Sequence, residues 1–165
     1  MNDKQPRWDN HFINLALQHA YMSKDPSTKV GAVIVGPHRE IRSTGFNGFP
    51  RGICDTPSRL HDRDTKLKLV VHAEMNAILN AARIGVSTDN CTLYLACTDS
   101  SKQVWGGCPC TRCTVEIIQS GIKEIVAYPF KPGQSAWLES TAKAYELLKE
   151  AGVTYRELLI GEAFE

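Results

Sequence analysis

Four side chains of this sequence have the types and spacing of a metal-dependent catalytic centre. His72 and Glu74 are two residues apart, and Cys110 and Cys113 are three residues apart. One imidazole and two thiolates suit tetrahedral zinc and leave its fourth coordination position open for water. A carboxylate beside such a water can take up its proton and pass it on, which is general acid/base chemistry.

The helix that carries His72 and Glu74 must begin at His72. In the middle of a helix, residues two apart point to opposite sides. The amphipathic pattern predicts a helix from about residue 72 to residue 82, so His72 can sit at its start, where the regular spiral does not bind its side chain. The expected buried face of this helix consists of Met75, Ile78, Leu79 and Ala82.

A second helix is expected to carry the two cysteines. Proline suits the first position of a helix, which predicts a helix from Pro109 to near Ser120. One helical turn then brings the sulfurs of Cys110 and Cys113 to the same side. The positive end of the helix dipole favours their thiolate forms.

The rest of the chain alternates between strands and helices. A β-hairpin is predicted from Val30–Val35 and Glu40–Phe46, and the long polar segment 47–68 is of a kind that is often functional or partly helical. Further helices are expected at Arg7–Ser23 and Ala136–Ala151, and further strands at Cys91–Cys97, Glu124–Ala127 and Val153–Leu159. This alternation predicts an α/β layered sheet with helices on both faces.

Length and charge narrow the classes of ligand. The chain has 165 residues and a formal net charge of +1, from 19 basic and 18 acidic side chains, and this size suggests one domain spanning residues 1–165. Proteins that bind nucleic acid usually have a basic excess, so a small anionic ligand is favoured and nucleic acid is not expected. The sequence contains neither a signal-peptide pattern nor a membrane-spanning run, so we expect a cytoplasmic protein without a membrane partner. In such a protein the cysteines are expected to serve metal or redox chemistry rather than disulfides.

Two other interpretations of the cysteines stay open. A purely structural zinc site would need a fourth protein ligand, for which Cys108, Cys97 and His61 are candidates. A redox-active cysteine pair would need a strand leading into the motif within a thioredoxin-like unit, and the sequence lacks that context. Glu74 favours the catalytic interpretation, because a structural site has no use for it.

Together, H-x-E at His72–Glu74 and P-C-x-x-C at Pro109–Cys113 resemble the signature of the zinc-dependent nucleobase deaminases. Longer segments are similar to the deoxycytidylate (dCMP) deaminase branch of that family, namely SKDPSTKVGAVIV (Ser23–Val35), GFNGFPRG (Gly45–Gly52), VHAEMNAIL (Val71–Leu79) and IIQSGIKEIV (Ile117–Val126). The similarity covers most of the chain from about Phe12 to Val153.

This resemblance implies a fold, an assembly and a reaction. The fold is a three-layer α/β/α sandwich around a five-stranded mixed sheet, and the assembly is a homo-oligomer, with a hexamer favoured and a dimer or tetramer as alternatives. The reaction is the zinc-dependent hydrolysis of dCMP to dUMP and ammonia. The alternatives are deamination of modified dCMP, cytidine, guanine or tRNA adenosine, and a non-catalytic, zinc-stabilised nucleotide-binding module.

The resemblance also implies roles for individual residues. One zinc ion per chain is held by His72, Cys110 and Cys113, and Glu74 is the general acid/base. The implied substrate contacts are the Ala73 backbone amide for the pyrimidine O2, Asn47 in the Asn47-Gly48 turn for the deoxyribose hydroxyl, and the loop of Ser27, Thr28 and Lys29 for the 5′-phosphate. Apart from the resemblance, Arg51 lies just past this turn and is a further phosphate candidate.

The chain departs from that family between residues 98 and 108, where such proteins usually have a very short link. The inserted segment contains Trp105, for which stacking on the substrate and a place at the surface or an interface are both open. Some phage members hold a second, structural zinc. Only Cys54 and His61 precede the H-x-E motif in the corresponding segment, so a second zinc is not expected here.

Overall fold

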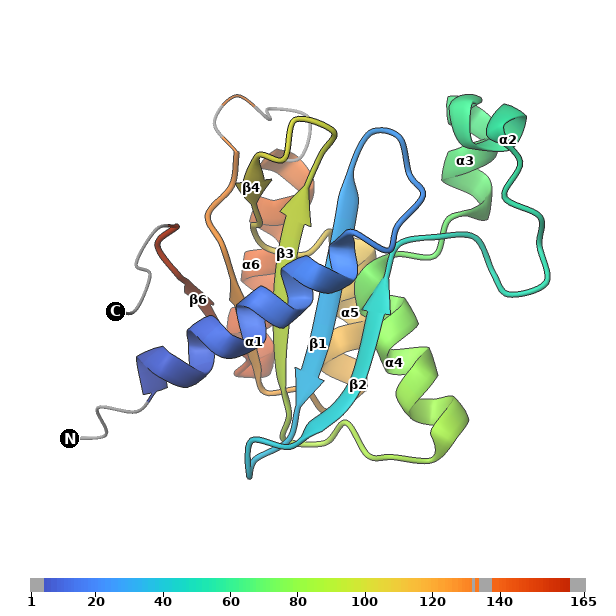
Figure 1. Ribbon diagram of the computed structural model, residues 1–165. Helices are drawn as coiled ribbons and strands as arrows, with labels where there is room; N and C mark the ends of the chain where they lie inside the picture. The colour runs from blue at the N-terminus through green and yellow to red at the C-terminus, as the bar shows by residue number, and fades with distance from the viewer. Residues whose placement is uncertain (1–4, 132, 134–137, 161–165) are drawn as a thin grey trace.

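The computed structural model describes residues 5–131, 133 and 138–160. Its helices are α1 (Gln5–Ala20), α2 (Pro57–His61), α3 (Arg63–Leu69), α4 (Ala73–Ile84), α5 (Thr111–Gln119) and α6 (Leu138–Ala151). Its strands are β1 (Lys29–Val35), β2 (Ile41–Phe46), β3 (Thr92–Thr98), β4 (Val104–Trp105), β5 (Glu124–Ala127) and β6 (Thr154–Glu157). Figure 1 shows their arrangement.

The strands form one mixed sheet in the order β2-β1-β3-β5-β6, with β4 paired to β3. β1 is antiparallel to β2 and β3, whereas β3, β5 and β6 run parallel. β4 pairs with Cys97 and Thr98 at the end of β3, on the side that β1 does not occupy, so it extends the line of β5. The predicted five-stranded mixed sheet is confirmed, and the inserted segment adds the short strand β4.

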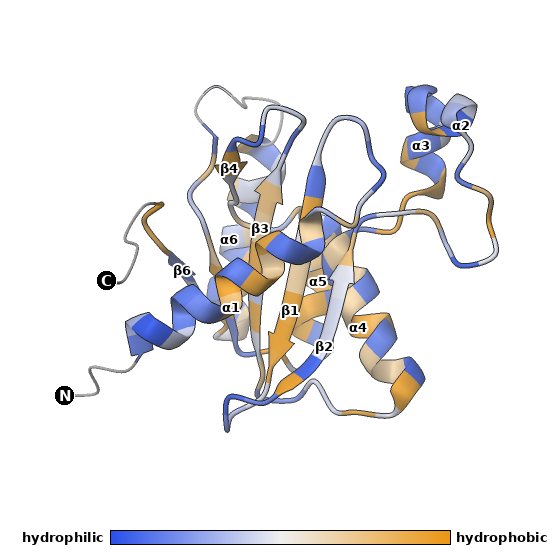
Figure 2. Cartoon of the chain, viewed as in Figure 1, coloured by the Kyte–Doolittle hydropathy of each residue, from blue (hydrophilic) through white to orange (hydrophobic). Residues whose placement is uncertain are grey.

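Apolar side chains alternate between two layers on either side of the sheet. On β3, Leu93 and Leu95 belong to the core formed with α4, α5 and α6, whereas Tyr94 and Ala96 belong to the core under α1. This alternation follows from the two-residue period of a strand. In Figure 1, α1 crosses one face of the sheet and α4, α5 and α6 lie on the other, and Figure 2 shows that the central strands are strongly apolar. The predicted three-layer sandwich is therefore confirmed.

Small side chains bring α4 against the sheet. The buried residues of this helix are Ala73, Glu74, Ala77 and Ala81. Gly45 on β2 permits the close approach, because a Cβ at this position would lie 2.4 Å from the backbone nitrogen of Ala77. The expected buried face was wrong, since its members are half-buried or exposed; they are Met75, Ile78, Leu79 and Ala82.

The long polar segment after β2 contains two short helices. Neither α2 nor α3 buries a residue, and the pair extends away from the sheet in Figure 1. The other expected elements are present with ends shifted by a few residues. Of the last predicted helix, Ala136 and Trp137 lie outside the described residues. No described helix is both long enough and apolar enough to span a membrane.

Candidate active site

His72 stands at the start of α4, as its spacing from Glu74 predicted. It is the N-cap residue, with extended backbone angles φ −67° and ψ 156°, and its carbonyl accepts the first helical hydrogen bond, from the amide of Asn76 at 2.9 Å. Its side chain makes no capping hydrogen bond. The imidazole is therefore free to turn toward α5.

Cys110 has the same position at the start of α5. It is the N-cap residue, with φ −62° and ψ 159°, and its carbonyl accepts from the amide of Thr114 at 2.9 Å. The predicted helix start at Pro109 was wrong, because the helix begins at Thr111 and the extended N-cap residue separates it from the proline. Cys113 then lies in the first turn, and its hydrogen bond with Cys110 and its burial raise the pKa of its thiol.

The two helix starts bring three ligand atoms together. His72 Nδ1 lies 3.3 Å from the sulfur of Cys113 and 3.6 Å from the sulfur of Cys110. Zinc–nitrogen and zinc–sulfur bonds at a tetrahedral angle give an N···S separation of about 3.6 Å, so the cluster has the dimensions of a zinc site. Within the described part of the chain these three residues form the one such group. The candidates for a fourth, structural ligand, Cys108, Cys97 and His61, are not in it.

Proton sharing within the cluster favours a thiolate at Cys110, while Cys113 keeps the shared proton. A hydrogen bond from Cys113 and the neighbouring His72 imidazole lower the pKa of the Cys110 thiol to about 4. The same Cys110 sulfur raises the pKa of His72 to about 9. A sulfur that is a thiolate at neutral pH is a ready ligand for a divalent cation.

Glu74 lies beside the cluster and is nearly enclosed by protein. The residue is 7% exposed, and burial raises the pKa of its carboxyl group. A hydrogen bond with Cys113 and the charge of His72 act in the opposite direction. The carboxyl group therefore stands at the metal cluster with a raised tendency to hold a proton, which is what a proton-transferring group requires.

The inserted segment after β3 packs tightly next to the site. Trp105 is 5% exposed and pairs with Cys97, and the ammonium of Lys131 lies 4.9 Å from the centre of the Trp105 ring. Cys108 is buried, and desolvation raises the pKa of its thiol to about 12. Cys97 and Cys108 are thus packing residues in this structure, whereas Cys54 is exposed.

Asn47 joins the end of β2 to the start of β1. Its side-chain amide donates to the carbonyl of Thr28 at 2.9 Å, and its oxygen accepts from the amide of Val30 at 2.8 Å. Gly48 pairs with Val71 through two backbone hydrogen bonds, 2.8 and 3.1 Å long. Because Val71 directly precedes His72, the Asn47-Gly48 turn is brought next to the metal cluster.

The loop of Ser27, Thr28 and Lys29 is organised by Asp25. One oxygen of this carboxylate accepts from the backbone amides of Ser27 and Thr28, at 2.8 and 3.2 Å. The Lys29 ammonium donates to the carbonyl of Ser23. Since Val30 packs on the side of α4 and strand residues alternate, Lys29 projects toward the α1 face, away from the metal cluster.

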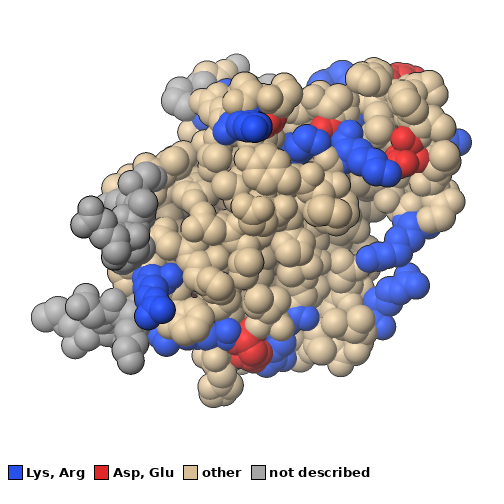
Figure 3. Space-filling model, in the orientation of Figure 1, with Lys and Arg blue, Asp and Glu red and all other residues tan. Residues whose placement is uncertain are grey.

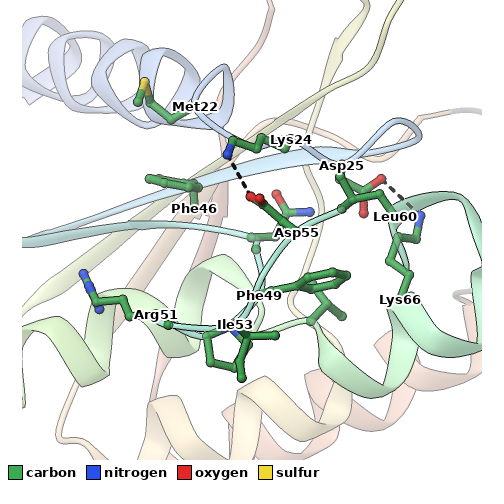
Figure 4. A pocket seen from close by; sticks show the side chains of 15 residues that line it. Met22, Lys24, Asp25, Phe46, Phe49, Arg51, Ile53, Asp55, Leu60 and Lys66 are labelled. Carbon is green, nitrogen blue, oxygen red and sulfur yellow. Dashed lines mark hydrogen bonds and ion pairs between the residues drawn. The ribbon is translucent and has the colours of Figure 1, made fainter. Parts of the chain in front are cut away.

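Lys66 on α3 is a cation that sequence reasoning missed. Its ammonium lies 3.1 Å from Asp25 Oδ1 and 3.4 Å from the hydroxyl of Ser27, and its side chain is only 12% exposed. Figure 4 shows this ion pair at the edge of a cavity of about 320 Å³, which Asn47 and Gly48 also line. Lys66 is 39 residues from Ser27, and no motif in the sequence joins the two positions.

Arg51 lies farther from the metal cluster. Its guanidinium donates to the side chain of Asn80 at 2.9 Å. Asn80 is eight residues along α4 from His72, which corresponds to about 12 Å at 1.5 Å per residue. Arg51 therefore stands at the outer rim of the same cavity, with no carboxylate partner among the described residues.

Basic side chains do not form a continuous track on the face drawn in Figure 3. Lys and Arg appear there in separate groups near the margin, around a central area without charges. The distribution on this face agrees with the expectation, from net charge, of a small ligand rather than a nucleic acid.

Comparison with known proteins leads to the same kind of site. Residues 6–129 match the family model described as "Cytidine and deoxycytidylate deaminase zinc-binding region". The deoxycytidylate deaminase of Mus musculus is 38% identical over 160 residues, which cover 94% of this chain and 82% of that protein. The Homo sapiens deoxycytidylate deaminase is 37% identical over 162 residues, covering 95% and 83%.

A solved structure with the same fold is the dCMP deaminase from the cyanophage S-TIM5, in complex with dCMP and dUMP. Its TM-score is 0.69 at 23% sequence identity, with 93% of this chain and 98% of that chain covered. The cluster of His72, Cys110 and Cys113 thus coincides with a family model that is named for zinc binding and spans most of the sequence. This chain belongs to the cytidine and deoxycytidylate deaminase zinc-binding family.

Proposed function

We propose that this chain is a dCMP deaminase, a zinc-dependent hydrolase that converts dCMP and water to dUMP and ammonia. The observation that supports it most is a cluster of three metal ligands with a buried carboxylate, Glu74, at its side. Structural zinc sites use four protein ligands, whereas catalytic sites leave one position open. The choice of dCMP rests on the similarity to deoxycytidylate deaminases from Mus musculus and Homo sapiens.

In this mechanism the residues around the base divide the work of proton transfer and orientation. His72, Cys110 and Cys113 would hold the zinc ion, which would supply Lewis-acid activation of the attacking water. Glu74 takes a proton from this water and delivers it to N3 while the C4–O bond forms. It then takes the remaining proton from the new C4 hydroxyl and passes it to N4, so that ammonia leaves as the C4–N4 bond breaks and the C4 carbonyl forms. The backbone amide of Ala73, in the first turn of α4, has no partner within the helix and donates to the pyrimidine O2.

The sugar and phosphate extend from this centre toward the loop before β1. Asn47 retains one amide hydrogen and one oxygen lone pair for the deoxyribose hydroxyl, and Gly48 forms the adjacent wall. Phosphate contacts are assigned to five residues: Ser27, Thr28, Lys29, Arg51 and Lys66. Of the three cations, Lys29 must first release the Ser23 carbonyl and Arg51 the Asn80 side chain, whereas Lys66 already contacts the Ser27 hydroxyl.

The proposal treats residues 1–165 as one deaminase domain, since every described strand belongs to the same sheet. It also includes a homo-oligomer, with a hexamer favoured. Large apolar side chains on the outer surfaces of α4 and α5 support self-association, because Leu79, Ile84 and Val115 are about half exposed or more. Residence in the cytoplasm stays a prediction from the sequence.

Replacement of Glu74 by glutamine tests the function directly. The variant should keep its zinc content and circular dichroism spectrum, but ammonia release from dCMP should fall by about 10²- to 10⁴-fold, because the proton carrier is lost. Glu146→Gln, on α6 and paired with the exposed Lys143, is the control and should stay active. An active Glu74→Gln enzyme would refute the assigned role, and faster turnover of deoxycytidine than of dCMP would refute the nucleotide substrate.

A further inference from the structure

Helix α4 is fastened to the edge strand β2 by side chains. Asn76 Nδ2 donates to the carbonyl of Phe46 at 2.8 Å, and Asn80 Nδ2 donates to the carbonyl of Thr44 at 2.8 Å. β2 is at the end of the sheet order, so every second carbonyl along it faces outward without a strand partner. The two asparagines supply the missing donors to these carbonyls.

Asn76 makes a second bond that Asn80 lacks. The same Nδ2 lies 3.4 Å from the carbonyl of Val71, which also accepts from the amide of Gly48 at 3.1 Å. Asn76 therefore bridges the segments 46–48 and 71–72. The first of these segments contains Asn47 and the second ends at His72, so one side chain joins the turn of the sugar contact to the first metal ligand.

We propose that Asn76 is a positioning residue, which sets the distance between the nucleotide bound at Asn47 and the metal cluster at His72. This inference rests on the proposed function, which supplies the nucleotide and the metal that are positioned. The bridge itself rests on the hydrogen bonds of Asn76 alone. Both hydrogens of the amide are directed at carbonyl oxygens, which an aspartate or an alanine at this position could not satisfy. An error of about 1 Å between reacting groups can cost about 10²-fold in rate, so loss of this bridge should be felt in the chemical step.

Ser43 provides a matched control for the structural part of this role. Its hydroxyl also ties β2 to α4, through a 2.6 Å hydrogen bond to the carbonyl of Ala77, but it touches neither segment of the bridge. Asn76→Ala should therefore lower the thermal unfolding temperature at least as much as Ser43→Ala, since Asn76 donates to two carbonyls and Ser43 to one. A difference in kcat between Asn76→Ala and Ser43→Ala therefore reports on the positioning of the substrate and not on the stability of the fold.

The first measurement is kinetic, on the zinc-loaded enzyme. Asn76→Ala should bind zinc in full and lower kcat on dCMP by about 10- to 100-fold, with KM changed less than about threefold. Asn76→Asp should be at least as impaired, whereas Ser43→Ala should keep kcat within about twofold. With 2′,3′-dideoxycytidine monophosphate, which lacks the 3′-hydroxyl, kcat should fall by the same factor in the wild type and in Ser43→Ala. It should fall by a smaller factor in Asn76→Ala. Wild-type kcat in Asn76→Ala would overturn the proposal.

The second measurement does not depend on the substrate. Amide hydrogen exchange at Gly48 and Val71 should be about tenfold faster in Asn76→Ala than in the wild type, and unchanged in Ser43→Ala. Equal exchange in all three proteins would also overturn the proposal. If the wild type failed to deaminate dCMP, the proposed function would fail, while the exchange experiment would still decide whether Asn76 holds the two segments together.

Discussion

Replacement of Lys66 by methionine should convert a nucleotide enzyme into one that discriminates poorly between dCMP and deoxycytidine. The ammonium is only 12% exposed and lies 3.4 Å from the Ser27 hydroxyl, so water screens its charge incompletely. A hydrogen bond to a charged group contributes about 1.5–3 kcal/mol, which corresponds to about 10- to 150-fold in kcat/KM. Because Asp25 shares the ammonium at 3.1 Å, we expect the lower part of this range, about 10- to 30-fold.

The assay compares kcat/KM for dCMP and for deoxycytidine by ammonia release. In the Lys66→Met variant, kcat/KM should fall for dCMP and stay unchanged for deoxycytidine, since deoxycytidine has no phosphate. The loop should persist, because Asp25 still accepts from the amides of Ser27 and Thr28. Lys68→Met, which removes the same charge from an exposed position on α3, is the control and should change neither value. An equal loss on both substrates, or no loss on dCMP, would refute the phosphate role of Lys66.

Two further predictions concern stability. Gly45→Ala places a Cβ 2.4 Å from the backbone nitrogen of Ala77, so α4 must shift. We expect the free energy of unfolding to fall by about 1–3 kcal/mol and zinc to be retained less well during dialysis against a chelator. An unchanged unfolding temperature and zinc content would contradict the close approach of α4 to β2. Arg156→Met leaves the Asp9 carboxylate, which is 3% exposed, without its cation, and should lower stability by about 1–3 kcal/mol in chemical denaturation. Arg112 is exposed and pairs with Glu116, so Arg112→Met should change the stability very little. Equal losses of stability in Arg156→Met and Arg112→Met would argue against the buried pair of Arg156 and Asp9.

Each half of the metal cluster could be predicted from local spacing, whereas the meeting of the two halves across 38 and 41 residues was implied by the resemblance to the deaminase signature. Two cysteines three residues apart need only one helical turn to converge, and the two-residue spacing of His72 and Glu74 requires a helix start. Both conditions constrain the backbone within a few residues, and the structure has His72 as an N-cap residue. The start of α5 was predicted two residues early, because a proline marks the beginning of a helix without fixing which following residue becomes the cap.

The nucleotide side of the site depended on contacts between distant segments. Lys29 is next to two hydroxyl residues in the sequence, yet strand alternation turns it toward α1, and its place beside Ser27 is taken by Lys66 from a helix that buries no residue. The buried face of α4 was likewise decided by Gly45 on another strand, which admits alanines and leaves Leu79 half exposed. Residue types and short spacings therefore determined the metal chemistry, whereas the choice of cation and of packing face required the tertiary structure, because both depend on which neighbour the folded chain brings within hydrogen-bond or van der Waals distance.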